Sequence, residues 1–462
     1  MPVPAASADD SLAVVRSRGY LGMLVFAALL GVPISAAAYL FLWVLNHGRQ
    51  WLFESLPTAL GFAAAPVWWP VPLLVVGGLL TAAAICYLPG HGGHSPADGF
   101  HGGGPPKAVE LPGILLAALA SLCFGAAVGP EGPLIALGSG LAVLATKAAR
   151  RRQVPEQGVR VLGSAGAFAA ISTLLGSPIT GAFLLMEASG LGGPMMALIL
   201  LPGLLASGVG ALIFVGLDSL TGLGTFSLAI PALPPFGRPD LAEFGWAIVI
   251  GLLAAVIAPA IQWLGRYLHP YAEKRAMIVL PLAGAAIAAL TIIYTEATGK
   301  PSSNVLFSGQ NDMGTLIQHA ASYSVGALLL LLVCKGLAYG VSLSSFRGGP
   351  IFPALFIGTA GGIAMSHLPG LPLVAAVAMG LGAMTAAAMR LPLTAVLLAS
   401  LLLLSDATKV MPLVIVAVVV AYVAVAHVLP RLGPRPAAAS QEPSAQATTP
   451  SGLRPRRLDR PA

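Results

Sequence analysis

The sequence predicts an all-α polytopic membrane protein whose membrane body consists of two related halves of tilted and broken helices. Three observations support this fold class: an apolar composition, long windows without charge, and a Gly-Pro segment that occurs twice. Of the 462 residues, 57% are hydrophobic and only 9% are charged. A soluble domain carries about 25% charged residues, so this composition is typical of a membrane protein.

Several windows without Asp, Glu, Lys or Arg are long enough to cross a bilayer, which takes about 20 apolar residues. They are residues 20–46, 68–88, 245–264, 276–294 and 411–430. We therefore expect one membrane body over residues 20–430, in contact with the lipid bilayer. A polar lead, residues 1–19, precedes it, and a disordered tail, residues 431–462, rich in Pro, Ala, Ser and Arg, follows without a regulatory soluble domain.

The net charge of +7 is not distributed like that of a nucleic-acid-binding protein, and we expect no nucleic acid partner. Arg16 and Arg18 precede the first window, residues 150–152 are three arginines after another apolar run, and several arginines follow the last window. Basic residues beside membrane spans mark the cytoplasmic side. We therefore expect a multi-pass protein of the cell (inner or plasma) membrane with both termini in the cytoplasm.

Other apolar runs are too short to cross the bilayer alone, such as residues 133–145, 353–366 and 392–404. Gly and Pro interrupt them. Irregular backbone at membrane depth is tolerated only where it is buried in protein or lines a wet cavity. Broken helices in corresponding halves of a chain indicate a transport site near the middle of the membrane.

The two halves are indicated by pairs of similar segments in the sequence. GPEGPLIALGSG at 129–140 resembles GPIFPALFIGTA at 349–360, and SPITGAFLLMEA at 177–188 resembles LPLTAVLLASLL at 391–402. LPGLLASGVG at 201–210 is a fainter match to MPLVIVAVVV at 411–420. Because the similar segments come in the same order in both halves, they predict a duplicated unit, with halves at roughly residues 68–216 and 275–430.

Glu131 is the main candidate for a functional residue, because it is a charged side chain at the head of an apolar run. Each GPxxP segment predicts a helix start, and the free N–H groups and dipole of a helix start attract anions. The Glu131 carboxylate can occupy that anion site and vacate it when protonated or displaced, which makes it a candidate gate. The matching residue of the second half is Ile351, so the architecture itself does not require a carboxylate. The alternative is a helix-start glutamate that faces a water-filled loop.

At these motifs the sequence resembles the CLC family of chloride channels and proton-coupled chloride antiporters. The family motif G-[KR]-E-G-P reads GPEGP at 129–133, and G-x-F-x-P reads GPIFP at 349–353. The resemblance implies a homodimer with one anion pathway in each subunit, two inverted halves with re-entrant helices, and Glu131 as the external gating glutamate. It also implies anion contacts at Gly129, Pro130, Gly132, Pro133, Gly349, Pro350, Ile351, Phe352 and Pro353.

The sequence departs from the family pattern where the anion is selected. Pro130 replaces a basic residue, and the serine-bearing loop of the family falls on GHGGHSPADGF at 90–100. His91 or Gly93 takes the serine position, depending on the register, and Ser95 is another candidate, so we assign His91, Gly92 and Gly93 to the anion site. Chloride is the expected anion, with fluoride or nitrate as alternatives.

The sequence also departs from the family pattern at the residues that carry protons in the antiporters. The inner proton-relay glutamate of the antiporters would follow Glu187, where this chain has Ala188, and the tyrosine of the last family helix has no counterpart after the final apolar run. We therefore expect a passive, voltage- and pH-dependent channel, with a proton-coupled antiporter as the alternative. Glu187 is either a possible proton relay or a capped helix end near water.

Other groups of residues give weaker indications of function. His91, His94 and His101 near Asp98 lack an established metal-ligand spacing, so we expect no metal site, no cofactor and no enzymatic activity. Lys335 and Arg347 flank the second motif, where they either concentrate anions or anchor the protein at the membrane surface. A transporter for an organic or metal-ion substrate would need more acidic residues at mid-membrane, and a scaffold without transport would not explain paired helix starts.

Overall fold

The computed structural model describes residues 14–99, 104–149, 156–189, 194–221, 236–403 and 407–432. All regular elements in these ranges are helices. Within them, eight helical segments are long and apolar enough to cross a membrane. Five overlap the windows that the sequence predicted, and the other three are 158–175, 198–221 and 325–345. The predicted all-α membrane fold is confirmed.

The N-terminal helices begin with α2 (Arg18–Gln50), whose first turn is capped by Ser17. After the short α3 (Leu56–Ala59) come α4 (Pro70–Tyr87), α5 (Leu111–Leu122), α6 (Glu131–Ala148), α7 (Glu156–Leu175), α8 (Pro178–Ser189) and α9 (Pro194–Thr221). Proline at the start of α4 and α5 fits a first turn whose N–H groups have no helical partner.

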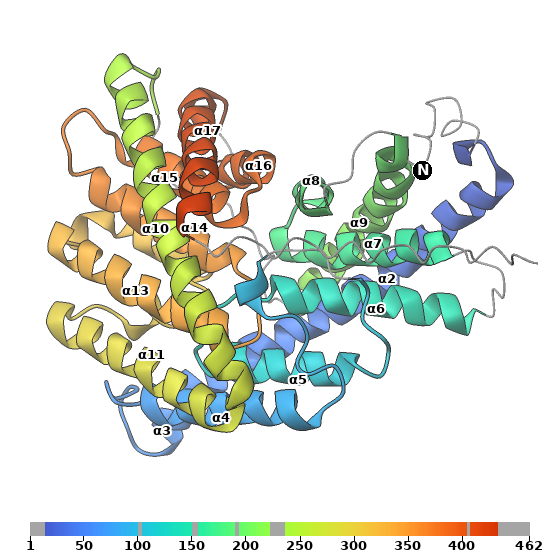
Figure 1. Cartoon of the computed structure of the whole chain (residues 1–462), viewed down its shortest axis with the longest axis horizontal. Coiled ribbons are helices and arrows are strands. Elements are labelled where there is room, and N and C mark those ends of the chain that lie inside the picture. The colour runs from blue at the N-terminus through green and yellow to red at the C-terminus, as the bar shows by residue number, and fades with distance from the viewer. Residues whose placement is uncertain are drawn as a thin grey trace, which may run out of the picture.

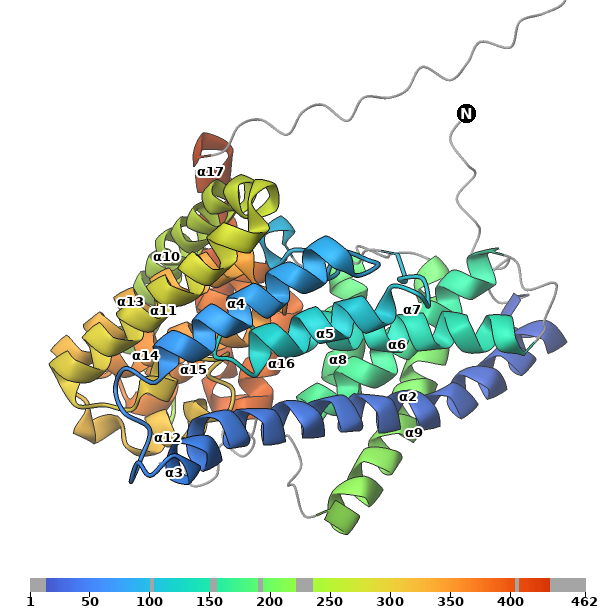
Figure 2. The ribbon, with the colours of Figure 1, turned by 90° about the horizontal axis from the view of Figure 1, so that it is seen from below.

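The C-terminal series begins with α10 (Leu241–Lys274), which starts with an Asp240–Glu243 capping box. It continues with α11 (Ala276–Thr298), the short α12 (Asp312–Gln318), α13 (Val325–Ser345), α14 (Ile351–Met365), α15 (Leu373–Met389), α16 (Pro392–Leu403) and α17 (Ala407–Leu432). In Figure 1 this series gathers on the left and α2 and α6 to α9 lie on the right, while Figure 2 shows α4 alongside α11.

The two series pack in corresponding ways. α6 packs on α7 as α14 packs on α15, and α7, α8 and α9 contact one another as α15, α16 and α17 do. α2 contacts α7 and α9, and α10 makes the matching contacts with α15 and α17. We infer that the repeat extends beyond the predicted 68–216 and 275–430 to include α2 and α10. The helices also run slightly beyond the predicted body of 20–430, from Arg18 to Leu432, and residues 433–462 lie outside the described part.

Pairs of glycines bring the short helices close to their neighbours. A Cβ atom on Gly138 of α6 would overlap the carbonyl oxygen of Gly166 on α7, and the reverse also holds. Gly358 of α14 and Gly380 of α15 are related in the same way. Small residues allow such backbone contact between helices inside a membrane. These contacts fix the positions of α6 and α14, whose first residues form the candidate site.

Candidate functional site

Two helix starts meet at the centre of the site. α6 begins at Glu131 and α14 at Ile351, and each is preceded by a Gly-Pro pair. The N–H of Gly129 donates a hydrogen bond of 2.7 Å to the carbonyl of Gly349, and the N–H of Gly349 donates back to the carbonyl of Gly129. The structure therefore joins the two motifs that the sequence comparison paired, 129–133 and 349–353.

Serines from opposite halves hold the segments that lead to these helices. Ser342 of α13 accepts a hydrogen bond of 3.0 Å from the N–H of Ala127, and Ser121 of α5 accepts one of 2.9 Å from the N–H of Arg347. Each half thus supplies a hydroxyl that fixes the linker of the other half. Neither serine was singled out in the sequence, although their separation is close to the repeat spacing and would have indicated the pair.

The Glu131 carboxylate lies at the start of α14. The N–H of Phe352 donates a hydrogen bond of 2.9 Å to Glu131 Oε1, and Oε2 has no hydrogen-bond partner. The side chain is fully buried, with 0% exposure. A Cβ atom on Gly129 or Gly349 would overlap this carboxylate, so neither position has room for a larger residue while Glu131 stays in place. A negative group therefore occupies a helix N-terminus in a buried place, where a free N–H and the helix dipole favour an anion.

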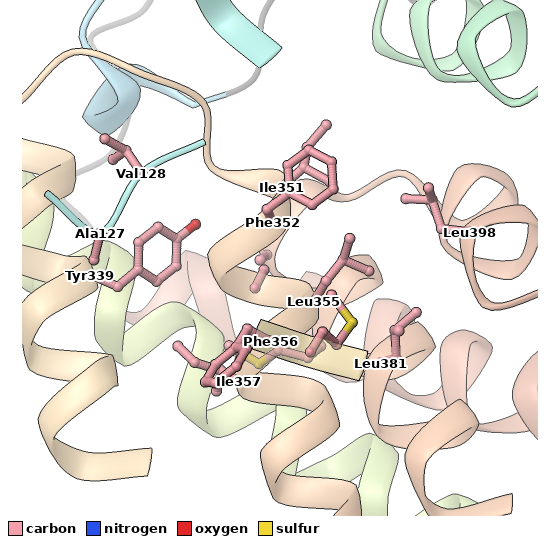
Figure 3. Packing of buried hydrophobic residues seen from close by; sticks show 14 of the residues in the cluster. Ala127, Val128, Tyr339, Ile351, Phe352, Leu355, Phe356, Ile357, Leu381 and Leu398 are labelled. Carbon is pink, nitrogen blue, oxygen red and sulfur yellow. The ribbon is translucent and has the colours of Figure 1, made fainter. Parts of the chain in front are cut away.

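Apolar and aromatic side chains are buried near the start of α14, where this carboxylate lies. Val128, Ile351 and Phe352 are fully buried around the start of α14, and Figure 3 shows their side chains with that of Tyr339. Tyr339 of α13 donates a hydrogen bond of 2.7 Å to the carbonyl of Pro350, and its hydroxyl is directed toward the start of α14 (Figure 3). No tyrosine follows the final apolar run of the sequence, and the buried Tyr339 was not singled out by sequence reasoning.

Not all predicted anion contacts share this place. The structure brings together Glu131 and the residues of 129–133 and 349–353. His91, Gly92 and Gly93 instead belong to the loop between α4 and α5, and they adopt positive φ angles of 48°, 72° and 79°. His91 and Gly93 line a separate cavity of about 310 Å³, whose lining does not include Glu131.

Glu187 makes contacts that favour its interpretation as a helix cap, and its role as a proton relay stays a prediction. Its carboxylate accepts hydrogen bonds from the N–H of Leu393 at 2.9 Å and from the N–H and hydroxyl of Thr394, both at 2.7 Å. A residue at the end of α8 thus caps the start of α16 from the other half of the chain. A carboxylate that is engaged in this way satisfies free N–H groups of a helix start.

Lys335 is not a surface anchor, and that interpretation was wrong. Its side chain is fully buried, and Nζ donates hydrogen bonds of 3.0, 2.8 and 2.8 Å to the carbonyls of Val305, Leu306 and Phe307. Lys335 therefore ties α13 to the segment before α12. In the described ranges, no group of three His, Cys, Asp or Glu residues is placed to hold a metal ion, and His101 lies outside those ranges.

The fold and the site define a multi-pass membrane protein in which a carboxylate lies at a meeting of two helix starts, an arrangement suited to moving anions. The family model described as voltage gated chloride channel matches residues 90–426. This chain belongs to that family, the CLC family, and anion transport across a membrane is the activity it shares with its members.

Relatives and solved structures agree with this assignment. The chain is 30% identical over 365 residues to "Putative ion-transport protein YfeO" of Salmonella newport (strain SL254), covering 77% of this chain and 84% of the relative. The corresponding protein of Escherichia coli (strain 55989 / EAEC) is 29% identical over 368 residues, covering 77% and 82%.

Two solved structures have the same fold. A slow cyanobacterial Cl⁻/H⁺ antiporter aligns with a TM-score of 0.68 at 22% identity, covering 88% of this chain and 94% of the other. A CLC-type fluoride/proton antiporter aligns with a TM-score of 0.66 at 19% identity, covering 87% and 95%.

Proposed function

We propose that this protein conducts chloride through a CLC-type pathway that Glu131 gates. The observation that carries the proposal is the 2.9 Å hydrogen bond from the N–H of Phe352 to Glu131 Oε1. The carboxylate occupies a helix N-terminus that would otherwise be free for an anion. When the side chain is protonated or displaced, the N–H of Phe352 becomes available to the ion. The backbone of 129–133 and 349–353 lines the anion site in this proposal.

Passive, voltage- and pH-dependent conduction is the mode that we propose. A coupled exchanger needs a second route that brings protons to Glu131. The carboxylates buried in the described part of the chain are Glu131 and Glu243, and Glu243 is committed to the capping box with Asp240. Glu187 is committed to the start of α16, and Ala188 follows it. These contacts favour a pathway without a carboxylate relay.

A proton-coupled antiporter is the second candidate. The observation in its favour is that both solved structures described above are of antiporters, one for chloride and one for fluoride. In this case protons would reach Glu131 without Glu187, and fluoride or nitrate would be alternative substrates.

The arrangement in the membrane is also part of the proposal. The arginines near both ends of the chain favour cytoplasmic termini in the cell membrane. Apolar side chains on α8, α9 and α16 remain exposed in the single chain, among them Ile179 at 59%, Leu212 at 74% and Leu393 at 46%. Such surfaces suit contact with lipid or with a second copy, and we propose a homodimer.

The test uses purified protein in liposomes with a chloride gradient, in which chloride efflux and internal pH are recorded together. Glu131→Ala is compared with Glu54→Gln, because Glu54 is exposed in the π-helical turn Trp51–Ser55 that follows α2. We expect chloride efflux without coupled proton movement in the wild type. We also expect efflux that no longer depends on pH in Glu131→Ala alone. Uphill proton movement would establish the antiporter instead, and wild-type pH dependence in Glu131→Ala would overturn the gating role.

A further inference from the structure

The C-terminal part of α10 carries an exposed stripe of aromatic side chains. Trp263, Tyr267 and Tyr271 follow one another at intervals of four residues, so they lie on one face of the helix. Their exposed fractions are 51%, 55% and 56%. The rings of Trp263 and Tyr267 are stacked with centroids 5.4 Å apart, and the ring centroids of Tyr267 and Tyr271 lie 6.0 Å apart. Exposed tryptophan and tyrosine are typical of the boundary between lipid and water.

Three cations border this stripe. Arg266 and Lys274 lie on the same side of α10 as the aromatic rings, and Arg275 joins α10 to α11. All three residues are exposed, and in the part of the chain that the structure describes no carboxylate forms an ion pair with them. Glu273 is directed at His269 instead, with Oε1 3.4 Å from Nε2. We call the following six residues the α10 corner: Trp263, Arg266, Tyr267, Tyr271, Lys274 and Arg275.

The α10 corner offers hydrogen-bond donors that are not used within the protein. The indole N–H, the two phenol hydroxyls and the three cationic groups make no side-chain hydrogen bond to another described residue. Arginine and lysine bind phosphate through charge-assisted hydrogen bonds, and arginine can do so through two parallel bonds. A phosphodiester, with its negative charge and its acceptor oxygens, therefore complements this group of side chains.

The α10 corner lies at a surface of the membrane. α10 and α11 are each long and apolar enough to cross a bilayer, and they meet at Arg275. Next to the corner the exposed side chains are aliphatic, with Val256 of α10 at 65% and Ile278 and Leu282 of α11 at 60% and 63%. The headgroup of a lipid can thus reach the corner while its acyl chains lie along these aliphatic side chains.

The cytoplasmic termini that we proposed place this corner on the cytoplasmic side. The segment of α2 and α3 can cross the membrane once and α4 once more, so a chain that starts in the cytoplasm returns there after α4. The loop after α4 and the end of α10 line the same cavity, through His94 and Glu273 among others, so they lie on the same side. Anionic lipids of the cytoplasmic leaflet attract basic segments.

We propose that the α10 corner binds the headgroup of an anionic phospholipid, whose phosphate the three cations hold beside the stacked rings. The inference goes beyond the proposed function, which concerns the path of the transported anion through the protein. It uses only the proposed position of the termini. The join of α10 and α11 also lies away from α8 and α16, which carry part of the surface offered to a second copy (Figures 1 and 2).

Native mass spectrometry of the full-length protein tests this site. Delipidated protein in detergent is titrated with phosphatidylglycerol and, separately, with phosphatidylcholine. The variant is Arg266→Gln/Arg275→Gln. Its matched control is Arg16→Gln/Arg18→Gln, which removes two exposed cations at the start of α2, also on the proposed cytoplasmic side.

We expect the wild type to bind phosphatidylglycerol more tightly than phosphatidylcholine. At about fivefold for each basic residue near the headgroup, Arg266→Gln/Arg275→Gln should weaken phosphatidylglycerol binding roughly 25-fold, and the control should leave it near the wild-type value. Tyr267→Phe/Tyr271→Phe, which keeps the charge and the rings, should give a smaller loss.

Three results would overturn the inference. The first is equal affinity of the wild type for the two lipids, and the second is an equal loss in the variant and its control. The third is complete displacement of phosphatidylglycerol by millimolar glycerol phosphate, since the site would then take a soluble phosphate ester. Lipid binding is measured without a transport step, so a wild type that prefers phosphatidylglycerol but moves no chloride would refute the proposed function alone.

Discussion

Glu131 Oε1 accepts a hydrogen bond of 2.9 Å from the N–H of Phe352, a residue from the other half of the chain. This contact places the charge of one half at the helix start of the other. Any movement that breaks this hydrogen bond therefore leaves both the N–H of Phe352 and the carboxylate of Glu131 without a partner.

Gly349→Ala is expected to displace Glu131. The new methyl group would overlap the carboxylate, and accommodating such an overlap in a packed interior costs about 1–3 kcal/mol. The side chain of Glu131 is the most movable obstacle, so we expect chloride flux to lose its pH dependence, as in Glu131→Ala. Gly361→Ala, within α14, is the control, because a Cβ atom there meets only Leu332 of α13, at 4.0 Å. Wild-type pH dependence in Gly349→Ala would show that the carboxylate does not lie where the structure places it.

Glu187→Ala is expected to destabilise the protein without changing proton movement. The substitution leaves three donors at the start of α16 without an acceptor, and each partly buried unpaired group costs about 1–3 kcal/mol. The midpoint of thermal unfolding in detergent should fall, and Thr394→Val should lower it less. Glu296→Gln, an exposed change on α11, controls for charge. A proton relay would give the opposite pattern, with altered internal pH and unchanged stability.

Ser121→Ala and Ser342→Ala are expected to weaken the joint between the halves. Each removes the acceptor of a buried N–H, which costs about 1–3 kcal/mol. Because both linkers enter the same pair of glycine hydrogen bonds, the double variant should depart from the sum of the single effects. Ser400→Ala is the control, since its hydroxyl donates to the carbonyl of Val396 in its own helix and, outside that helix, meets only the sulfur of Met411 at 3.5 Å. Simple additivity, measured by thermal unfolding, would mean that the two linkers act independently.

Lys335→Met is expected to be the most damaging of these changes. It removes charge-assisted hydrogen bonds to three carbonyls, each worth about 1.5–3 kcal/mol. We expect little folded protein after purification, measured by size-exclusion chromatography. Lys107→Met is the control, because that side chain is 80% exposed. A normal yield of Lys335→Met would show that water replaces the ammonium group.

The sequence predicted the fold and the meeting of the two motifs because both depend on patterns that repeat along the chain. Apolar windows marked α2, α4, α10, α11 and α17, and the Gly-Pro echo marked the starts of α6 and α14. That these residues bind the anion stays a prediction.

What the sequence missed are contacts between side chains that lie far apart in it. Ser121 and Ser342 are ordinary residues of apolar helices, and only their place beside the opposite linker gives them a role. Glu187 had two interpretations because its partner, Thr394, comes from the other half. The Arg347 side chain lies against the backbone of Gly92, from a distant part of the chain, and no local pattern records this contact.

The reciprocal bonds between Gly129 and Gly349 have a consequence for biosynthesis. Ribosomes add about 5–20 residues per second, so Gly349 follows Gly129 by roughly 10–45 s. Throughout that interval the first Gly-Pro segment and its glutamate wait in the membrane without their partner. Nascent chains truncated between the halves should therefore expose the carboxylate to chemical modification, and a quality-control protease could recognise the unpaired half by that exposure.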